Sequence, residues 1–284
     1  MRLIRLALPP LLARQVHQIW LFESACGLPV GDLRTVVPNG RTRLILPLVG
    51  GLTASAGSTR WEVPAGRAVL VGQWERPAVL SAPAEPLATI GVEFTTTGLA
   101  AFHAGPLSAL SGEIVDVEDV LGPLARRLME RTRSAPTPLE AAHLVRAGLA
   151  AWLLGRDVPT ARLSDVALQM MRKGNYRMGL EELAQRTGYS RRHLLTQFQR
   201  DIGLSPSRIQ TILAFEQLYR GLAQHGSARL MIQSALDRFH DQAHFTRVFR
   251  NLAGLPPARF AARDNRFGRL FYEEAADRSP VSSA

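Results

Sequence analysis

Residues 1 to about 118 carry short apolar runs of strand length, separated by residues that favour turns. The clearest runs are Arg43–Val49, Ala68–Val71, Ala78–Leu80 and Ala88–Phe94. Glycine, proline and serine cluster between the runs, as at Gly50-Gly51. Short apolar runs bounded by such clusters are typical of β-strands. Many strands at this spacing predict a small β-barrel or sandwich.

The apolar period becomes helical from Val120. One helical face is marked by Leu121, Leu124 and Leu128, and a second by Leu139, Ala142, Leu149 and Leu153. This spacing predicts two helices joined around Ser134-Ala135-Pro136. Residues 155–159 then read as a linker, and the chain beyond them is predicted to be helical to about Arg263.

A capped pair of helices is predicted after this linker. The first runs from Gly179 to Thr187, and Gly188 follows where a left-handed C-terminal cap is needed. Ser190 can cap the next helix by accepting a hydrogen bond from the free amides of its first turn. Leu194 and Phe198, four residues apart, then point into the core.

The chain repeats this pattern 51 residues later. Asp241 takes the capping position of Ser190, while Phe245 and Phe249 take the two core positions. Gly-Leu-Ser-Pro ends the first copy and Gly-Leu-Pro-Pro the second. Between the copies, Pro206–Gln224 is predicted to be one continuous amphipathic helix. Such a repeat predicts two helix-turn-helix units that a rigid helix holds in register for successive major grooves of DNA.

The outward faces of the two repeated helices carry side chains suited to reading bases. They are Arg191, Arg192, Leu195, Thr196 and Gln199 in the first copy, and Gln242, Ala243, Thr246, Arg247 and Arg250 in the second. Arginine pairs with guanine, glutamine with adenine, and a methyl group with thymine. Either face alone could be an ordinary solvated surface, but the repeat favours DNA contact.

Charge is concentrated in the same half of the chain. Residues 159–272 hold 18 basic and 8 acidic side chains, whereas residues 1–158 hold 15 and 13. A basic C-terminal half beside a nearly neutral N-terminal half is typical of a polyanion-binding module joined to a different domain.

Residues from about 165 to 263 resemble the DNA-binding domain of AraC/XylS-type transcription regulators. The resemblance rests on two patterns, Leu183-Ala184-x-x-x-Gly188-Tyr189-Ser190 through Phe198, Gly203 and Pro206, and Asp241-Gln242-Ala243-His244-Phe245 through Phe249, Gly254 and Pro257. It implies that the outward residues of both helices face double-stranded DNA. It also implies regulation of transcription, with contact to RNA polymerase as a further expectation.

One position departs from the family pattern. The family has a glycine before the aromatic residue that Phe239 represents, and this chain has Arg238 there. The approach to the second unit is also one residue shorter than the family pattern, so its turn is expected to be tighter. We therefore expect the first helix to read more sequence than the second.

The N-terminal half resembles the cupin-like sensor halves of one AraC-type subgroup. The resemblance rests on Ile19-Trp20, Val37-Pro38-Asn39-Gly40 and Gly91-Val92-Glu93-Phe94. It implies a small-molecule effector in the barrel, with dimerisation through the helices between Val120 and Leu154. Residues that could line such a site are Trp20, Trp61, Trp74, Glu93 and His103. Each of them could equally be an ordinary core or rim residue.

No metal, cofactor or catalytic group is expected. Cys26 is the only cysteine, so a cysteine-based zinc site and an intramolecular disulfide are excluded. His240 and His244 are spaced like the ligands of a zinc protease. However, the acidic residue between them is Asp241 in a capping position, and no third ligand lies nearby.

Membrane insertion and export are not expected. The basic and apolar start resembles a signal peptide, but Pro9-Pro10 interrupts it and no clear cleavage site follows. The longest apolar candidate, Leu144–Leu154, contains Arg146 and is too short to span a bilayer. A cytoplasmic protein is therefore expected.

The sequence thus predicts a two-domain chain. A β-rich, cupin-like sensor domain spans 1–118, a helical linker or dimerisation region 119–158, an AraC-type all-α tandem helix-turn-helix domain 159–266, and a largely disordered tail 267–284. The expected function is sequence-specific DNA binding in transcription regulation, modulated by a small-molecule effector, without enzymatic activity. Two alternatives stay open. The barrel could have its own ligand-binding or enzymatic activity, or the protein could be an interaction adaptor that does not bind DNA.

Overall fold

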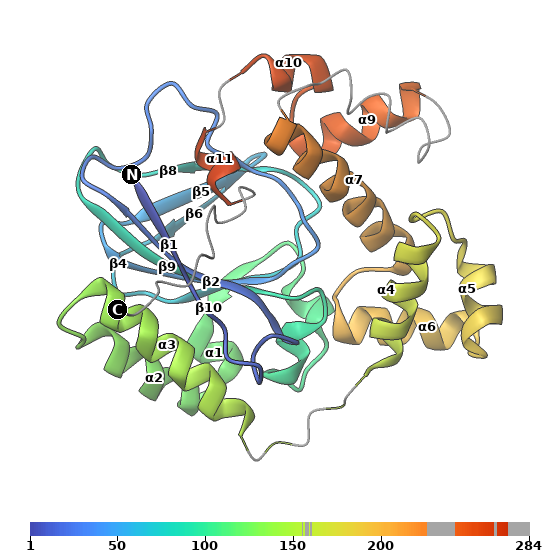
Figure 1. Cartoon of the computed structure of the whole chain (residues 1–284), viewed down its shortest axis with the longest axis horizontal. Helices are drawn as coiled ribbons and strands as arrows, with labels where there is room; N and C mark the ends of the chain where they lie inside the picture. Colours follow the sequence, from blue (N-terminus) through green and yellow to red (C-terminus); the bar gives the residue numbers. More distant parts are fainter. Residues whose placement is uncertain (155, 157–158, 160, 226–241, 264–265, 272–284) are drawn as a thin grey trace, which may run out of the picture.

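The protein has a β-rich N-terminal half and a helical C-terminal half (Figure 1). The computed structural model describes residues 1–284 except 155, 157–158, 160, 226–241, 264–265 and 272–284. Its ten strands all precede Val117, where the first α-helix begins. This confirms the predicted fold class. In the described part of the chain, no helix is both long and apolar enough to cross a membrane.

The strands form two antiparallel sheets. The first has six strands in the order β1-β2-β9-β4-β7-β10, and the second has four in the order β3-β8-β5-β6. Their bounds are β1 Arg2–Leu6, β2 Val16–Ser24, β3 Thr35–Val36, β4 Arg43–Val49, β5 Leu52–Ala56, β6 Thr59–Val63, β7 Val69–Val71, β8 Ala78–Ser81, β9 Leu87–Phe94 and β10 Ile114–Asp116. The four runs predicted from the sequence fall on β4, β7, β8 and β9.

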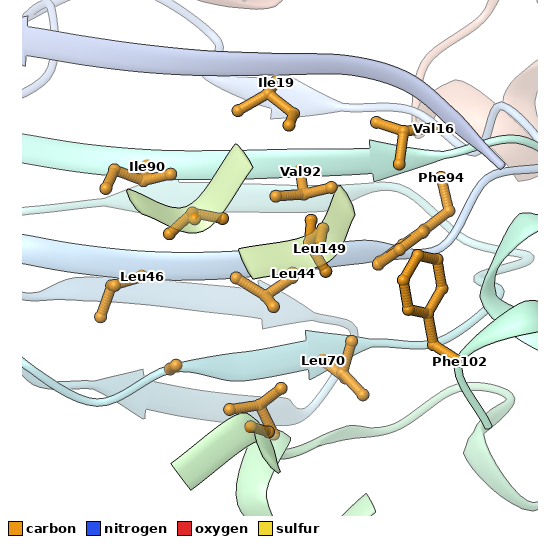
Figure 2. Close-up of a cluster of buried hydrophobic side chains, with 14 of the residues drawn as sticks. Val16, Ile19, Leu44, Leu46, Leu70, Ile90, Val92, Phe94, Phe102 and Leu149 are labelled. Carbon is orange, nitrogen blue, oxygen red and sulfur yellow. The ribbon is translucent and has the colours of Figure 1, made fainter. Parts of the chain in front are cut away.

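Alternation along the central strands gives the six-stranded sheet two different faces. In β9, Ile90, Val92 and Phe94 belong to the main apolar core, whereas Thr89 and Glu93 line a cavity on the other side. Neighbouring strands follow the same alternation, because successive side chains of a strand point to opposite faces. Figure 2 shows the core face, where Ile19, Leu44 and Leu46 lie beside Ile90 and Val92.

Three helices cover the core face of this sheet (Figure 1). They are α1 (Val117–Leu121), α2 (Pro123–Arg133) and α3 (Pro138–Leu153). Leu149 of α3 packs among the strand side chains (Figure 2). The Oγ1 atom of Thr137 caps α3 by accepting from the amide of Glu140 at 3.2 Å. The predicted helix junction at residues 134–136 is therefore confirmed.

The C-terminal half is built around the long helix α7. Its helices are α4 (Leu163–Lys173), α5 (Leu180–Thr187), α6 (Arg191–Asp201), α7 (Pro206–His225), α9 (Gln242–Ala253) and α10 (Pro257–Ala261). The four predicted anchors Leu194, Phe198, Phe245 and Phe249 are at most 1% exposed, so both copies of the repeat use them as core residues.

The long helix α7 was predicted to be amphipathic, and the structure corrects this. Helix α7 is buried on two sides, because it packs on the helical core and also contacts the N-terminal half. Ile209 and Leu213 approach Gly40, whose backbone is left-handed (φ 72°) and where an added Cβ would lie 2.8 Å from a Leu213 methyl carbon. Glu216, on the same helix, pairs with Arg41 at 3.4 Å.

Further bonds join the two halves away from α7. The Ser111 hydroxyl donates to the carbonyl oxygen of Gly203 at 2.8 Å, and the Arg162 guanidinium donates to that of Ala100 at 3.0 Å. Because both acceptors are backbone atoms, these two bonds fix the backbone of the opposite half at Gly203 and at Ala100.

The chain after α10 differs from the predicted disordered tail, 267–284. Residues Arg266–Leu270 form the short helix α11, and Phe267 is 4% exposed. Figure 1 shows α11 beside the strands and not beside α10. The sequence pattern missed this helix because its few apolar residues pack on the distant N-terminal half. Residues 272–284 lie outside the described part.

Replacing Gly91 by alanine is predicted to destabilise the protein. Gly91 lies opposite Trp20 in the β2–β9 register, and an added Cβ would overlap the indole ring. Overpacking of this kind lowers the free energy of unfolding by about 1–3 kcal/mol, which urea unfolding of the full chain measures. Gly221→Ala in α7 is the control, because nothing lies within 4 Å of an added Cβ there and alanine is favoured over glycine inside a helix. Equal stabilities of the two variants would contradict the predicted overlap.

Candidate DNA-reading helices and effector cavity

The first helix-turn-helix unit, α5–α6, has the caps that its sequence predicts. Gly188 ends α5 in the left-handed conformation, with φ 73° and ψ 12°. The hydroxyl oxygen of Ser190 then accepts from the amide of His193 at 3.2 Å and begins α6. The ring of His193 stacks on Tyr189 with centroids 5.0 Å apart. This histidine is therefore part of the helix start.

The outward face of α6 is exposed along its length. Its residues are Arg191, Arg192, Leu195, Thr196 and Gln199. Arg191 pairs with Glu181 of α5 at 3.0 Å, so part of its charge is used within the unit. Among the described residues Arg192 has no ion pair, which leaves its guanidinium available for a ligand. The Thr196 hydroxyl donates to the backbone oxygen of Arg192 at 3.0 Å.

The α9 face of the second unit is similar. Gln242, Ala243, Arg247 and Arg250 are exposed, whereas Thr246 is half-buried and donates to the Gln242 carbonyl oxygen at 2.8 Å. The predicted cap Asp241, the departure at Arg238 and the histidine at 240 lie outside the described residues. No group of three or more His, Cys, Asp or Glu that could hold a metal occurs in the described part of the chain.

Aromatic contacts hold α7 between the two units. Phe215 of α7 packs edge-on against Phe249 of α9 at 5.3 Å between ring centroids. Tyr219, one turn further along, contacts Phe260 of α10 at 5.6 Å. Phe198 of α6 belongs to the same core cluster. Both candidate DNA-reading helices are therefore anchored on one packed core.

The N-terminal half borders the outward face of α6. A shallow depression is lined by Ala104 and Pro106 on one side and by residues of α6 on the other, namely Leu195, Thr196, Gln199 and Arg200. The loop that contains Ala104 thus lies next to side chains predicted to meet DNA.

A cavity of about 970 Å³ lies between the two sheets. Most of its wall is apolar, with side chains from both sheets, among them Trp20, Phe22, Ile45, Leu52, Ala54, Val63, Leu80 and Leu87. A volume of this size, an apolar lining and a small number of polar groups are features of small-molecule sites.

Polar residues gather at one part of this cavity, around the carboxylate of Glu93. Its Oε1 atom accepts from Asn39 Nδ2 at 2.8 Å and from Arg43 Nε at 3.0 Å. Its Oε2 atom accepts from Gln18 Nε2 at 2.9 Å. Glu93 is 5% exposed, so its charge is compensated almost entirely by protein groups.

The surroundings of Glu93 keep it ionised. Burial by itself would raise the pKa of Glu93, but the charges of Arg43 and Arg41, with smaller contributions from His17 and the Asn39 hydrogen bond, lower it to about 2. The carboxylate is therefore a permanent negative charge at neutral pH, and it fixes the position of Arg43.

The helical half contributes a charge to the same cavity. Arg220 of α7 lines it and pairs with Glu216 at 2.6 Å, and Glu216 also binds Arg41 of the N-terminal half. Among the residues that the structure describes, the cavity lining holds four arginines, Arg5, Arg41, Arg43 and Arg220, and one carboxylate, that of Glu93. The described part of the lining therefore carries a net positive charge.

Two buried polar atoms of the cavity lining lack a protein partner. Within the described part of the chain, Trp74 Nε1 and Thr89 Oγ1 are buried and make no hydrogen bond. Buried polar groups in proteins are almost always satisfied, so such atoms are candidates for bonds to a ligand or to water.

Three of the five predicted effector residues line the cavity, namely Trp20, Trp74 and Glu93. Trp61 does not line it, and its ring packs on that of Trp74 at 5.0 Å between centroids. His103 is also outside the lining, with its Nδ1 atom 3.2 Å from the carbonyl oxygen of Val120. Trp61 and His103 are therefore not part of the cavity lining.

Residues 183–263 match a family model described as a helix-turn-helix domain. The C-terminal half contains an AraC-type helix-turn-helix domain. The resemblance drawn from the sequence is thereby confirmed for this part of the chain. The AraC-type domain includes α6, α7, α9 and α10 in full and most of α5. No curated protein matches the chain in sequence.

Some solved structures are similar at low identity. Unsaturated fatty acid bound ToxT from Vibrio cholerae strain SCE256 is 10% identical over 87% of this chain and 96% of that chain, with a TM-score of 0.46. The AraC-like transcriptional activator CuxR is 19% identical over 73% of each chain, with a TM-score of 0.25. A cupin superfamily protein from Desulfitobacterium hafniense DCB-2 is 17% identical over 33% of this chain and 77% of that chain, also at 0.25.

Several cavity residues were missed by sequence reasoning. Gln18 and Arg43 could have been found, because they alternate with core residues along β2 and β4. Arg220 from the AraC-type domain and Phe267 beyond it could not, because nothing local in the sequence indicates that they reach the barrel.

The paired carboxylate of Glu93 predicts a specific dependence of stability on pH. Its pKa is lowered on folding from 4.5 to about 2, so its stabilisation is complete above about pH 4.5 and is lost as the pH falls towards 2. Glu93→Gln should therefore reduce the free energy of unfolding near pH 7 by on the order of 3 kcal/mol. This difference from the wild type should shrink as the pH falls below about 4.5.

Urea unfolding near pH 7 and near pH 3 measures this difference. Glu113→Gln is the control, because Glu113 is exposed. A difference between wild type and Glu93→Gln that is the same at both pH values would contradict the lowered pKa.

Proposed function

We propose that the protein is a transcription regulator that binds specific DNA sequences through its AraC-type domain and responds to a small molecule held in its N-terminal cavity. The observation that carries the proposal is the pair of exposed helix faces, on α6 and α9, anchored on one core through α7. A rigid pair of helices with basic, amide and methyl-bearing faces suits two major-groove contacts.

The ten outward residues are assigned to DNA by this proposal. They are Arg191, Arg192, Leu195, Thr196 and Gln199 of α6, and Gln242, Ala243, Thr246, Arg247 and Arg250 of α9. Contacts to phosphates supply affinity that falls with salt, and contacts to base edges supply sequence choice. We assign base reading first to Arg192, because it has no ion pair among the described residues, whereas Arg191 shares its charge with Glu181.

The cavity supports binding of a small effector with an apolar body and an anionic or hydrogen-bond-accepting group. The apolar wall suits the body, and the excess of arginine over carboxylate suits an anion. The indole N–H of Trp74 is a donor that such a group could use. The alternative of an independent barrel activity has no specific observation in its favour.

Effector binding can alter DNA binding because the N-terminal and C-terminal halves meet at two places, the cavity and the outward face of α6. Arg220 brings α7 to the cavity, and the loop with Ala104 and Pro106 borders Leu195 and Thr196. A ligand that changes how the halves pack would therefore change access to the α6 face. Location in the cytoplasm, contact with RNA polymerase and dimerisation complete the proposal. Leu124 of α2 and Leu139 of α3, which are 51% and 39% exposed, support a dimer through these helices.

Arg192→Ala is predicted to remove one base preference. Sequences selected from random DNA by the full wild-type chain define the preferred site, and binding to it is then measured for the variant. The affinity should fall by about 1–3 kcal/mol, with discrimination lost at one base step, as expected for a bidentate arginine–guanine contact. Arg2→Ala removes an exposed arginine from the start of β1, and it should keep both affinity and preference. Equal weakening of all sequences by Arg192→Ala would make Arg192 a phosphate contact instead.

Filling the cavity is predicted to prevent ligand binding. The probe is 8-anilinonaphthalene-1-sulfonate, an apolar aromatic anion whose fluorescence rises in apolar sites. Ala54→Phe places a ring in the cavity and should weaken probe binding by roughly tenfold or more. Ala65→Phe is the matched control, because Ala65 is exposed outside the cavity. If both variants bind the probe like the wild type, the cavity is not its site and the effector proposal fails.

A further inference from the structure

Helix α11 follows the AraC-type domain in the chain but packs on the N-terminal half. It begins at Arg266, a few residues after α10 ends at Ala261. The backbone amide of Phe267 donates to Asp32 Oδ2 at 3.2 Å, and Asp32 is 8% exposed. The Arg5 guanidinium of β1 donates to the carbonyl oxygen of Leu270. Polar bonds from two separate segments thus fix the position of α11 on the barrel.

Aromatic rings complete this attachment. Phe267 meets Phe22 edge-on at 5.5 Å between centroids, and Phe271 meets Trp20 at 5.0 Å. The two phenylalanines also contact each other at 5.3 Å. Aromatic pairs in such edge-on arrangements add to the stability gained from burial alone. The contact is therefore a packed interface between the chain end and the strands.

The same rings are part of the effector cavity. Phe267, Gly268 and Phe271 line it together with Trp20 and Phe22. A molecule that fills the apolar part of the cavity would therefore touch α11 directly. Removing α11 would take Phe267, Gly268 and Phe271 out of this part of the lining and uncover Trp20 and Phe22, the rings on which they pack.

Helix α10, which precedes α11 in the chain, packs against the second helix-turn-helix unit. Phe260 of α10 is 4% exposed and lies between Tyr219 of α7 and Phe249 of α9, at 5.6 and 5.8 Å between ring centroids. The five residue steps from Ala261 to Arg266 can span at most about 18 Å. If α11 moves further than this connection allows, α10 must therefore move with it.

We propose that α11 is a wall of the effector site, contributed by the chain end, and that a bound ligand fixes it and thereby α10 and the second helix-turn-helix unit. The inference rests on the proposed effector cavity and adds to it the ligand contacts Phe267 and Phe271. It also adds a physical connection from the ligand to the DNA-binding half that does not use the loop beside α6.

Chains of different length test this inference with the anilinonaphthalene sulfonate probe. The full chain, a chain ending at Phe271 and a chain ending at Arg263 differ in whether α11 is present. The chain ending at Phe271 should bind the probe like the full chain. The chain ending at Arg263 should bind it roughly tenfold more weakly or not at all. Retained salt-dependent binding to random DNA verifies that the AraC-type domain of the shortest chain is folded.

Point variants and hydrogen exchange complete the test. Phe271→Ala in the full chain should weaken probe binding, and the conservative Phe271→Leu should restore most of it. Saturating probe should slow amide exchange in residues 257–263 of the full chain and of the chain ending at Phe271, but not in the chain ending at Arg263.

The possible failures are distinguishable. Probe binding that Ala54→Phe leaves unchanged in the full chain would refute the effector cavity itself. Probe binding that is sensitive to Ala54→Phe but equal in the chains ending at Phe271 and Arg263 would overturn the assignment of α11 to the site. Binding that requires α11 without slower exchange in residues 257–263 would overturn the connection to α10.

Discussion

The burial of strand β9 on both faces is the constraint on which the rest of the structure depends. All eight of its residues are buried, so every side chain needs a suitable partner on its own side. Ile90, Val92 and Phe94 meet an apolar layer closed by helices, and this sets the place of α1–α3. Glu93 points to the opposite side, where its charge needs compensation. The cavity lies on that opposite side, and its arginines supply this compensation.

The compensation of Glu93 draws several segments into one electrostatic unit. Gln18, Asn39 and Arg43 bind the carboxylate directly, and Arg41 adjoins them while reaching Glu216 on α7. Charges in this unit are shared across the boundary between the halves, so they do not belong to either half alone. A molecule entering the cavity therefore meets a preorganised set of charges in which each arginine is already oriented by a neighbour.

The sequence predicted those features of the structure that depend on residues close together in the chain. Caps at Gly188 and Ser190, the repeated aromatic anchors and the strand runs follow from spacing and backbone chemistry, and each was found as predicted. Of the cavity residues, the sequence indicated Trp20, Trp74 and Glu93. Residues contributed from elsewhere, such as Arg220 and Phe267, depend on contacts over long sequence separations. The same limit explains why α7 was predicted to have one buried side when it has two, since its second partner is a loop at Gly40.

The position of α11 determines when the cavity can be completed during synthesis. Asp32 and Phe267 are 235 residues apart, yet they form one hydrogen bond at the edge of the cavity. During synthesis the strands leave the ribosome long before this helix, and domains generally fold as they emerge. Until α11 emerges, the barrel therefore lacks the two phenylalanine rings that pack on Trp20 and Phe22. Because α11 follows the AraC-type domain in the chain, its part of the cavity lining can be added only after the DNA-binding half has been made.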